Sequence, residues 1–95
     1  MDATGWKGGT LGVRVGKENA ARYFDRAWKI VHIDIGGNIR AFPLTPGFWS
    51  DCPEIRGIAI QEWMERQGLA PWPKGRPPKL ELIPLGGSHF RLKRK

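Results

Sequence analysis

Residues Trp28–Leu44 read WKIVHIDIGGNIRAFPL, and their pattern predicts a β-hairpin. The first half of this stretch is rich in β-branched residues and alternates apolar with polar positions from Val31 to Ile35, which is the pattern of a half-buried strand. The segment Gly36–Asn38 can adopt the positive φ angles of a tight hairpin, so the chain should return as a paired strand. Pro43 has no N–H to donate, which places its end of the hairpin at a sheet edge or a strand terminus.

A second hairpin of the same kind is predicted near the C-terminus. Residues Lys79–Leu85 read KLELIPL, in which Leu80 and Leu82 would face the core. A Gly-Gly-Ser turn follows, and the returning segment HFRLK would direct Phe90 and Leu92 inward.

Two helices are predicted as well. Residues Lys17–Phe24 read KENAARYF, whose apolar side chains recur at helical spacing after a short strand at Leu11–Val15. A longer helix should cover about residues 52–67, where Asp51 would cap the N-terminus and Glu54 completes a capping-box pattern. Apolar side chains form a wide arc over this segment, so we expect a helix buried on more than one flank.

These elements define the fold class as α+β. We expect a small antiparallel, barrel-like sheet of about five strands, covered by the long helix at about 52–67 and accompanied by the short helix at about 17–24. The 95 residues fit one domain. Within it, residues 1–9 would form a flexible N-terminal arm because they contain no apolar run, and residues 94–95 would form a short basic tail.

The composition excludes several classes of protein. Cys52 is the only cysteine, so no internal disulfide can form and a disulfide-stapled secreted scaffold is excluded. The first residues lack the layout of a signal peptide, and no stretch approaches the ~20 apolar residues of a membrane span. We therefore expect a cytoplasmic protein with no membrane partner.

Positive charge is concentrated in the last quarter of the chain. Residues 1–70 contain nine Lys or Arg and eight Asp or Glu, whereas residues 71–95 contain seven and one. A one-sided basic region on a small protein indicates a polyanionic partner, most often nucleic acid. The final RLKRK is also compatible with a solvated tail that keeps the protein soluble. The candidate nucleic-acid-binding residues are Arg14, Lys74, Arg76, Lys79, Arg91, Lys93, Arg94 and Lys95.

The Pro-rich segment carries a short motif. Residues 73–79 read PKGRPPK and resemble the AT-hook, a minor-groove motif with a basic-Gly-Arg-Pro centre, although Lys74 stands where the family usually has Arg. The resemblance implies that Arg76 sits in the negative potential of a narrow groove, which the bare backbone at Gly75 would enter. The alternative is an extended connector between helix and strand. Trp72 would either stack on a base or pack between its neighbouring prolines.

The N-terminal region carries a longer resemblance. Residues Gly5–Phe24 contain a Trp and Gly-rich step, a strand reading LGVRV, a basic-acidic pair and a short Ala-containing helix, and a Gly-Gly-Asn hairpin follows. In this order, residues 5–43 resemble the AbrB/MazE-like family of swapped-hairpin barrels. The resemblance implies a dimer, a regulatory role and a DNA contact through Arg14. The chain departs from the family at Gly16, where a Pro is usual, and residues 45–95 have no counterpart in its short members.

Other chemistry finds little support in the sequence. His32 and His89 are isolated, no Cys or His pair has zinc spacing, and the Gly-Gly pairs lack the Lys-Ser/Thr of a phosphate loop. We therefore predict no enzymatic activity, no cofactor and no metal. Phe48 and Trp49 precede the predicted helix cap, where they would either pack into the core or form a contact surface, and Trp49 is a candidate partner contact.

The predicted function is that of a small non-enzymatic nucleic-acid-binding protein, with duplex DNA as the expected ligand. A homodimer is one of the oligomeric states that we expect. The competing hypothesis is a protein-interaction or oligomerisation module that uses the Trp residues and the Pro-rich segment. Salt dependence separates the two, because DNA binding weakens steeply with salt whereas a Trp-anchored protein contact changes little.

Overall fold

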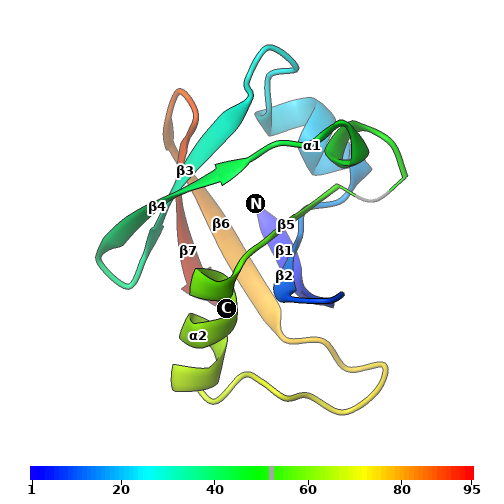
Figure 1. Cartoon of the computed structure of the whole chain (residues 1–95), viewed down its shortest axis with the longest axis vertical. Helices are drawn as coiled ribbons and strands as arrows, with labels where there is room; N and C mark the ends of the chain where they lie inside the picture. Colours follow the sequence, from blue (N-terminus) through cyan, green and yellow to red (C-terminus); the bar gives the residue numbers. More distant parts are fainter. Residues whose placement is uncertain (52) are drawn as a thin grey trace.

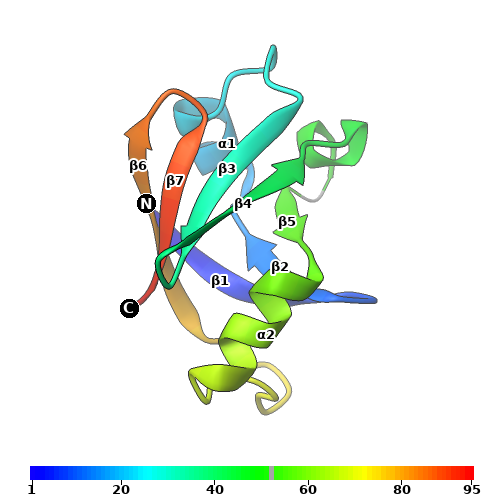
Figure 2. The same ribbon diagram turned by 60° about the vertical axis from the view of Figure 1, so that its left-hand side comes forward.

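The structure, a computed structural model, describes residues 1–51 and 53–95. Over these residues, seven strands form one sheet that curls into a nearly closed barrel (Figures 1 and 2). Their order is β4-β3-β7-β6-β1-β2-β5, and neighbours are antiparallel except for β3 and β7, which are parallel. The strands are β1 (Asp2–Lys7), β2 (Leu11–Arg14), β3 (Ile30–Ile35), β4 (Asn38–Pro43), β5 (Glu54–Arg56), β6 (Lys79–Gly86) and β7 (His89–Arg94).

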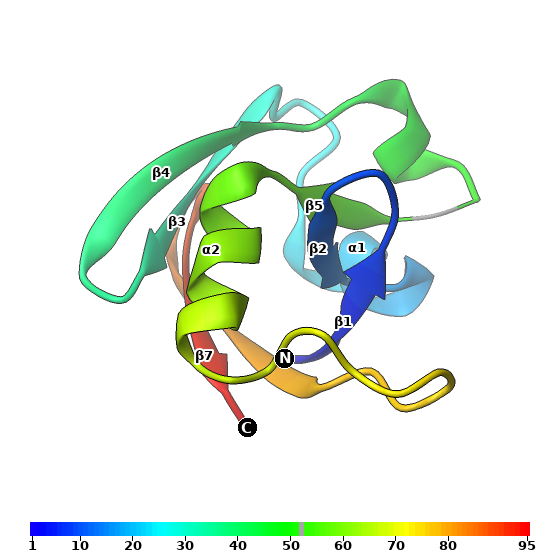
Figure 3. The same ribbon diagram turned by 60° about the horizontal axis from the view of Figure 1, so that its bottom comes forward.

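Helical segments lie at both ends of the barrel. One end carries α1 (Lys17–Tyr23) and a 3-10 turn, η1 (Pro46–Trp49); the other carries α2 (Ile58–Arg66) and the loop at residues 67–78 (Figure 2). We call these the α1 end and the α2 end. Figure 3 brings the α2 end forward and shows α2 and the following loop in front of the strands. Neither helix of the described residues has the length and apolar character needed to cross a bilayer.

Both predicted hairpins are confirmed, together with their buried faces. β3 and β4 pair from Ile30 opposite Pro43 to Ile35 opposite Asn38, and β4 is an edge strand, as Pro43 requires. In β6 and β7 the leucines and Phe90 predicted to face inward are buried. The α+β class and the barrel-like sheet are confirmed as well. α1 lies within the range expected for a short helix.

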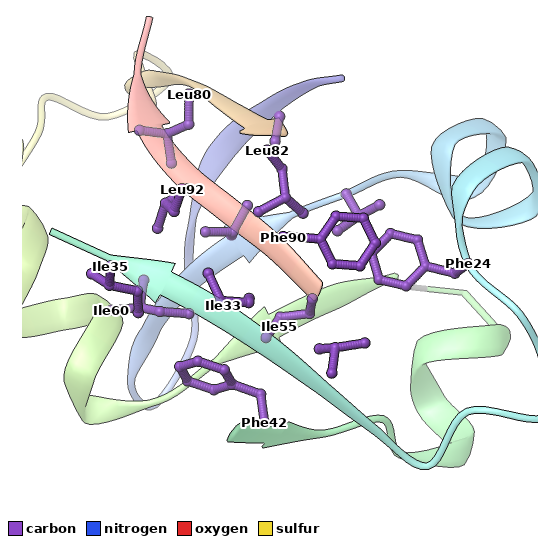
Figure 4. Close-up of a cluster of buried hydrophobic side chains, with 14 of the residues drawn as sticks. Phe24, Ile33, Ile35, Phe42, Ile55, Ile60, Leu80, Leu82, Phe90 and Leu92 are labelled. Carbon is purple, nitrogen blue, oxygen red and sulfur yellow. The ribbon is translucent and has the colours of Figure 1, made fainter. Parts of the chain in front are cut away.

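The inward faces of the strands meet in one hydrophobic core (Figure 4). Phe24, which follows α1, stacks on Phe90 of β7 with ring centroids 4.7 Å apart and also packs against Phe48 of η1 at 5.0 Å. Aromatic pairs at such distances stabilise a core beyond the area they bury. The aromatic cluster therefore seals the α1 end, and it confirms Phe48 as a core residue.

The strand count differs from the expectation of about five, and part of the difference lies in the first residues. Residues 1–9 were expected as a flexible arm, yet Asp2–Lys7 form β1, which pairs with β2 on one side and β6 on the other. Ala3 is buried against the core, so the segment needs no long apolar run to pack. The expectation of an arm is wrong because long-range pairing on both sides supplies the backbone hydrogen bonds of this segment.

The expectation of one long helix at 52–67 is wrong. Residues Glu54–Arg56 form β5, and α2 covers only Ile58–Arg66, nine residues against seven in α1. Ile55 points into the core opposite Val13 of β2, so strand pairing replaces the predicted first helical turn. Asp51 and Glu54 therefore cap no helix. The first residue predicted for that helix, Cys52, lies outside the described residues.

The predicted basic tail at residues 94–95 is held against the sheet and does not extend freely from it. Arg94 is the last residue of β7, and the Lys95 N–H donates a hydrogen bond to the Lys79 carbonyl at 3.2 Å. The Lys95 amino group also donates to the carboxylate of Asp2. These contacts hold the segment against β6 and β1.

Candidate functional site

Two of the predicted basic residues of β7, Arg91 and Lys93, point outward, and each lies opposite a carboxylate on a neighbouring strand. Arg91 lies opposite Asp34 of β3, and its Nε donates to Asp34 Oδ2 at 3.3 Å. Lys93 lies opposite Glu81 of β6. Opposite charges placed directly across two strands attract each other, so this part of the outer face presents mixed rather than basic charge.

Arg14 and Lys79 share the outer face with them. Thr4 of β1 lies between them: Lys79 of β6 is opposite it on one side and Arg14 of β2 on the other. With strands spaced at about 4.8 Å, their Cα atoms are roughly 10 Å apart. Glu54 of β5 lies opposite Arg14 and adds a carboxylate to this row of residues; its Oε2 is buried without a hydrogen-bond partner among the described residues.

Unbalanced positive charge gathers instead at the α2 end, beginning with the Pro-rich loop. A turn centred on Lys74 and Gly75 is closed by a hydrogen bond from the Arg76 N–H to the Pro73 carbonyl at 3.0 Å. Gly75 has φ +79°, which glycine adopts at little cost, and no heavy atom beyond its neighbours approaches within 4 Å of where its side chain would begin. The loop tip is therefore open, and both Lys74 and Arg76 are exposed.

Trp72 ties this loop to β1. A Cβ atom built at Gly5 would lie 3.1 Å from the ring of Trp72 and 2.7 Å from that of Pro78, whose carbonyl accepts a hydrogen bond from the Gly5 N–H at 2.9 Å. The indole is half-buried against the core, and the Lys7 amino group stands 5.7 Å from its centre. Trp72 therefore packs mainly against β1 rather than between its neighbouring prolines.

A second pair of an indole and a cation lies on the other face of the β1–β2 pair. Trp6 is opposite Gly12, and Gly12 is opposite Arg56, so Trp6 and Arg56 both face outward. The Arg56 guanidinium stands 5.5 Å from the Trp6 ring, a cation–π arrangement. Gly8 leaves room for this ring, because a Cβ atom there would overlap it.

Sequence reasoning missed Trp6, Lys7 and Arg56 as site residues. The first two fell in the expected arm and the third in the expected helix, so nothing placed them beside the Pro-rich loop. The adjacent Trp6-Lys7 pair, an aromatic next to a cation between glycines, is the signal that could have drawn attention to this segment.

The cations of the α2 end form what we call the basic end. Lys79 begins β6 directly after the loop, and the last residues of the chain lie beside it. Of its seven exposed members, only Lys95 has an ion-pair partner among the described residues. The last turn of α2 adds one carboxylate, Glu65, and one cation, Arg66, which lines the hollow beside β4 and is not counted among the seven. The members of the basic end are Lys7, Arg56, Lys74, Arg76, Lys79, Arg94 and Lys95.

The ion pair of Lys95 with Asp2 sets the charge state of both groups. The hydrogen bond from the Lys95 amino group, together with its charge, holds the pKa of the Asp2 carboxyl below its usual range. The same hydrogen bond raises the pKa of Lys95. Both groups are exposed, so the pair contributes little to stability and leaves the other six cations unneutralised.

Trp49 lies far from the other predicted contacts, at the α1 end. Its ring packs edge-on against Phe48 with centroids 4.9 Å apart, and the Arg26 guanidinium stands 4.8 Å from its centre. A hollow of about 470 Å³ between α1 and η1 is lined by these residues and Lys17. The structure thus places Trp49 and Trp72 at opposite ends of the barrel, so one ligand surface cannot include both.

Two histidines meet on the outer face without forming a metal centre. His32 of β3 and His89 of β7 stack with ring centroids 4.7 Å apart. Over residues 1–51 and 53–95, no group of three or more His, Cys, Asp or Glu side chains is arranged to hold a metal ion.

Comparisons with family models, curated proteins and solved structures gave no match to this chain. The resemblances of residues 5–43 to the AbrB/MazE-like barrels and of residues 73–79 to the AT-hook therefore stay predictions.

Proposed function

We propose that this protein binds nucleic acid through the basic end, with duplex DNA as the expected ligand. The observation that carries the proposal is the presence of seven exposed cations at one end of the barrel, where Lys7 and Arg56 each stand over a half-buried indole. Among residues 1–51 and 53–95, only Lys95 of these seven has an ion-pair partner. The chain as a whole has a net charge of +7, which favours encounter with any polyanion. No reaction is proposed.

The parts of the basic end suit different parts of a nucleic acid. Lysines and arginines neutralise phosphates and release condensed counterions, which supplies affinity without sequence information. The loop tip at Lys74–Gly75 is narrow and projects from the barrel, so it is the segment able to enter a groove. If the AT-hook resemblance holds, Arg76 lies in the minor groove. The indoles of Trp6 and Trp72 lie on opposite faces of the β1–β2 pair, and each could contact an unpaired base.

The first test is titration of a labelled DNA duplex at two salt concentrations. If about five cations contact phosphates, affinity should fall roughly 500-fold between about 50 and 200 mM salt. The variant Lys74→Ala/Arg76→Ala should bind more weakly at low salt, and its salt slope should be smaller by about two. A matched control, Arg22→Ala/Lys29→Ala, removes the same charge at the α1 end and should leave the slope nearly unchanged.

Two outcomes would count against the proposal. Absence of duplex binding at low salt would reject nucleic-acid binding altogether. Equal losses in the two double variants would show that net charge, rather than the basic end, determines binding. Parallel titrations with single-stranded DNA and duplex RNA identify the preferred ligand, because a stacking contribution from the indoles would favour unpaired strands.

A further inference from the structure

Strand β4 has an edge that pairs with no other strand in the part of the chain that the structure describes. The His32 N–H of β3 donates to the Ser88 carbonyl at 2.9 Å, toward β7 and away from β4. Residues of an antiparallel pair alternate in hydrogen-bonding direction, so Ala41, which is opposite His32, turns its N–H and carbonyl away from β3. Ile39, two residues earlier, does the same. β4 is the terminal strand of the sheet, so these four groups face the open side, where the Ile39 carbonyl accepts a long hydrogen bond of 3.5 Å from Arg40 Nη1.

Apolar side chains that the fold leaves uncovered flank this edge. Ile39 on the outer face of β4 is 61% exposed, and Ile58 at the start of α2 is 63% exposed. Between the β3–β4 hairpin and α2 lies a hollow of about 500 Å³, lined by Ile58, Arg40, Arg66 and Glu62 among others. An exposed edge strand beside a hollow lined by both apolar and charged side chains is a template for another strand.

The charges beside the edge decide which strand fits. Arg40 lies between Ile39 and Ala41 and shares the inner side of the hairpin with Ile33, so it faces the hollow. A second copy of this chain paired antiparallel about that position would place Arg40 against Arg40, and like charges directly opposite destabilise a strand pair. Two chains of net charge +7 also repel each other. Two cations, Arg40 and Arg66, line the hollow against one carboxylate, Glu62, so the complementary occupant carries carboxylates.

We propose that the β4 edge binds an extended acidic segment of another protein, which adds to the sheet as an eighth strand. Its backbone pairs with Ile39 and Ala41. Its Asp or Glu side chains point into the hollow toward Arg40 and Arg66, and alternate apolar side chains cover Ile39 on the outer face. The recognised pattern is therefore apolar and acidic residues in alternation.

The added strand is short, because the chain just after β5 lies against the end of β4. A Cβ atom at Gly57 would lie only 2.9 Å from the ring of Phe42, so the chain after β5 touches β4 at this point. Pairing is therefore confined to Asn38–Ala41. This site is separate from the basic end, so its occupation should not depend on Lys74 or Arg76.

The probe is a synthetic peptide of about eight residues with alternating Val and Glu, a usual strand length. Titration into the ¹⁵N-labelled protein should shift the amide signals of Ile39 and Ala41 most strongly. A matched peptide with Lys in place of Glu should bind at least about fivefold more weakly, as expected when opposite-charge strand contacts become like-charge contacts. Equal binding of the two peptides, or shifts centred elsewhere, would overturn the proposal.

Two variants complete the test. Ala41→Pro removes one open N–H and should abolish binding, provided that circular dichroism shows a folded protein. Arg40→Glu, at an exposed position, should reverse the preference between the two peptides, whereas Arg22→Glu on α1 should not. Unchanged preference in Arg40→Glu would overturn the proposal even if Ala41→Pro failed to fold. A concentration-dependent dimer in sedimentation that involves the β4 edge would assign it to a second copy instead.

Discussion

Asp2 and Lys95 connect the first strand of the sheet to the residue that follows the last. Because the Lys95 amino group lowers the pKa of the Asp2 carboxyl, their ion pair is present at neutral pH. A carboxyl with a lowered folded-state pKa stabilises the fold above its unfolded pKa, and that contribution is lost as the pH falls through the folded value. Its size is small because both groups are exposed.

The ion pair predicts a measurable titration. In the wild type, the Asp2 carboxyl carbon should titrate in NMR below the usual range of an aspartate. In Lys95→Met the midpoint should move up toward that range, because the dominant cause of the shift is gone. Lys93→Met, which removes a cation outside this contact, is the control and should leave Asp2 nearly unchanged. An Asp2 midpoint that does not respond to Lys95→Met would contradict the contact.

Gly12 is a position where the fold has no room for a side chain. A Cβ atom there would lie 2.5 Å from the Ile55 carbonyl oxygen and 2.8 Å from the Arg56 Cα, both in the backbone of β5. The Gly12→Ala variant should therefore lower the free energy of unfolding by about 1–3 kcal/mol, as overpacking usually does. Chemical denaturation measures this change.

Gly9→Ala is the matched control, because nothing lies within 4 Å of its added methyl group. Its effect should stay within about 0.5 kcal/mol. If both variants were equally stable, β5 would not approach β2 as closely as the structure shows.

At the scale of elements, the hairpins were predictable because their signals are local. Alternation over Val31–Ile35 fixes which face is buried, and a Gly-Gly turn fixes where the chain reverses. The same holds for β6 and β7. Both signals operate between residues that are close in sequence, so no knowledge of the rest of the fold is needed.

β1 and β5 were not predictable, because distant strands determine them. Residues Asp2–Lys7 contain glycine, threonine and a single large apolar side chain, and become a strand only between β6 and β2. Glu54–Arg56 carry a capping-box pattern that favours a helix start, yet the burial of Ile55 opposite Val13 outweighs it. Tertiary packing routinely overrides such local preferences.

The residues of the candidate site also fall into those that local sequence predicts and those that only the distant strands place. Lys74, Arg76 and Lys79 were predictable because they are neighbours in sequence, and the structure keeps them at one end. Predicting that Arg56 joins them required knowing that β5 exists. The outward direction of Arg91 was predictable from alternation, but its pairing with Asp34 was not, because it follows from the parallel contact of β3 with β7.

At the scale of the molecule, the net charge of +7 acts on the fold itself. The Debye length is about 30 Å at 0.01 M salt and about 8 Å at 0.15 M. The molecule measures 35 × 29 × 21 Å, so at low salt each cation repels nearly all the others. Only two ion pairs offset this repulsion among the described residues. Self-repulsion of this kind destabilises the compact state.

The thermal midpoint should therefore rise by a few degrees when sodium chloride is increased from about 0.01 to about 0.15 M. Differential scanning fluorimetry at constant pH measures it. A variant that lowers the net charge, Lys74→Glu/Arg76→Glu, should respond less to salt. A midpoint that falls with salt in the wild type would mean that attractive rather than repulsive pairs dominate.

The β6–β7 hairpin joins two parts of the sheet that do not otherwise pair. β4 and β3 lie on one side of it, and β1, β2 and β5 lie on the other. The contact of β7 with β3 spans 57 residues of sequence, as between Arg91 and Asp34. On the ribosome, β6 and β7 are the last of the seven strands to emerge. Until then, β3–β4 and β1–β2–β5 can only form two separate groups of strands with unpaired edges. Unpaired edges invite aggregation, so the interval before the final hairpin emerges is when a nascent chain would most depend on a chaperone.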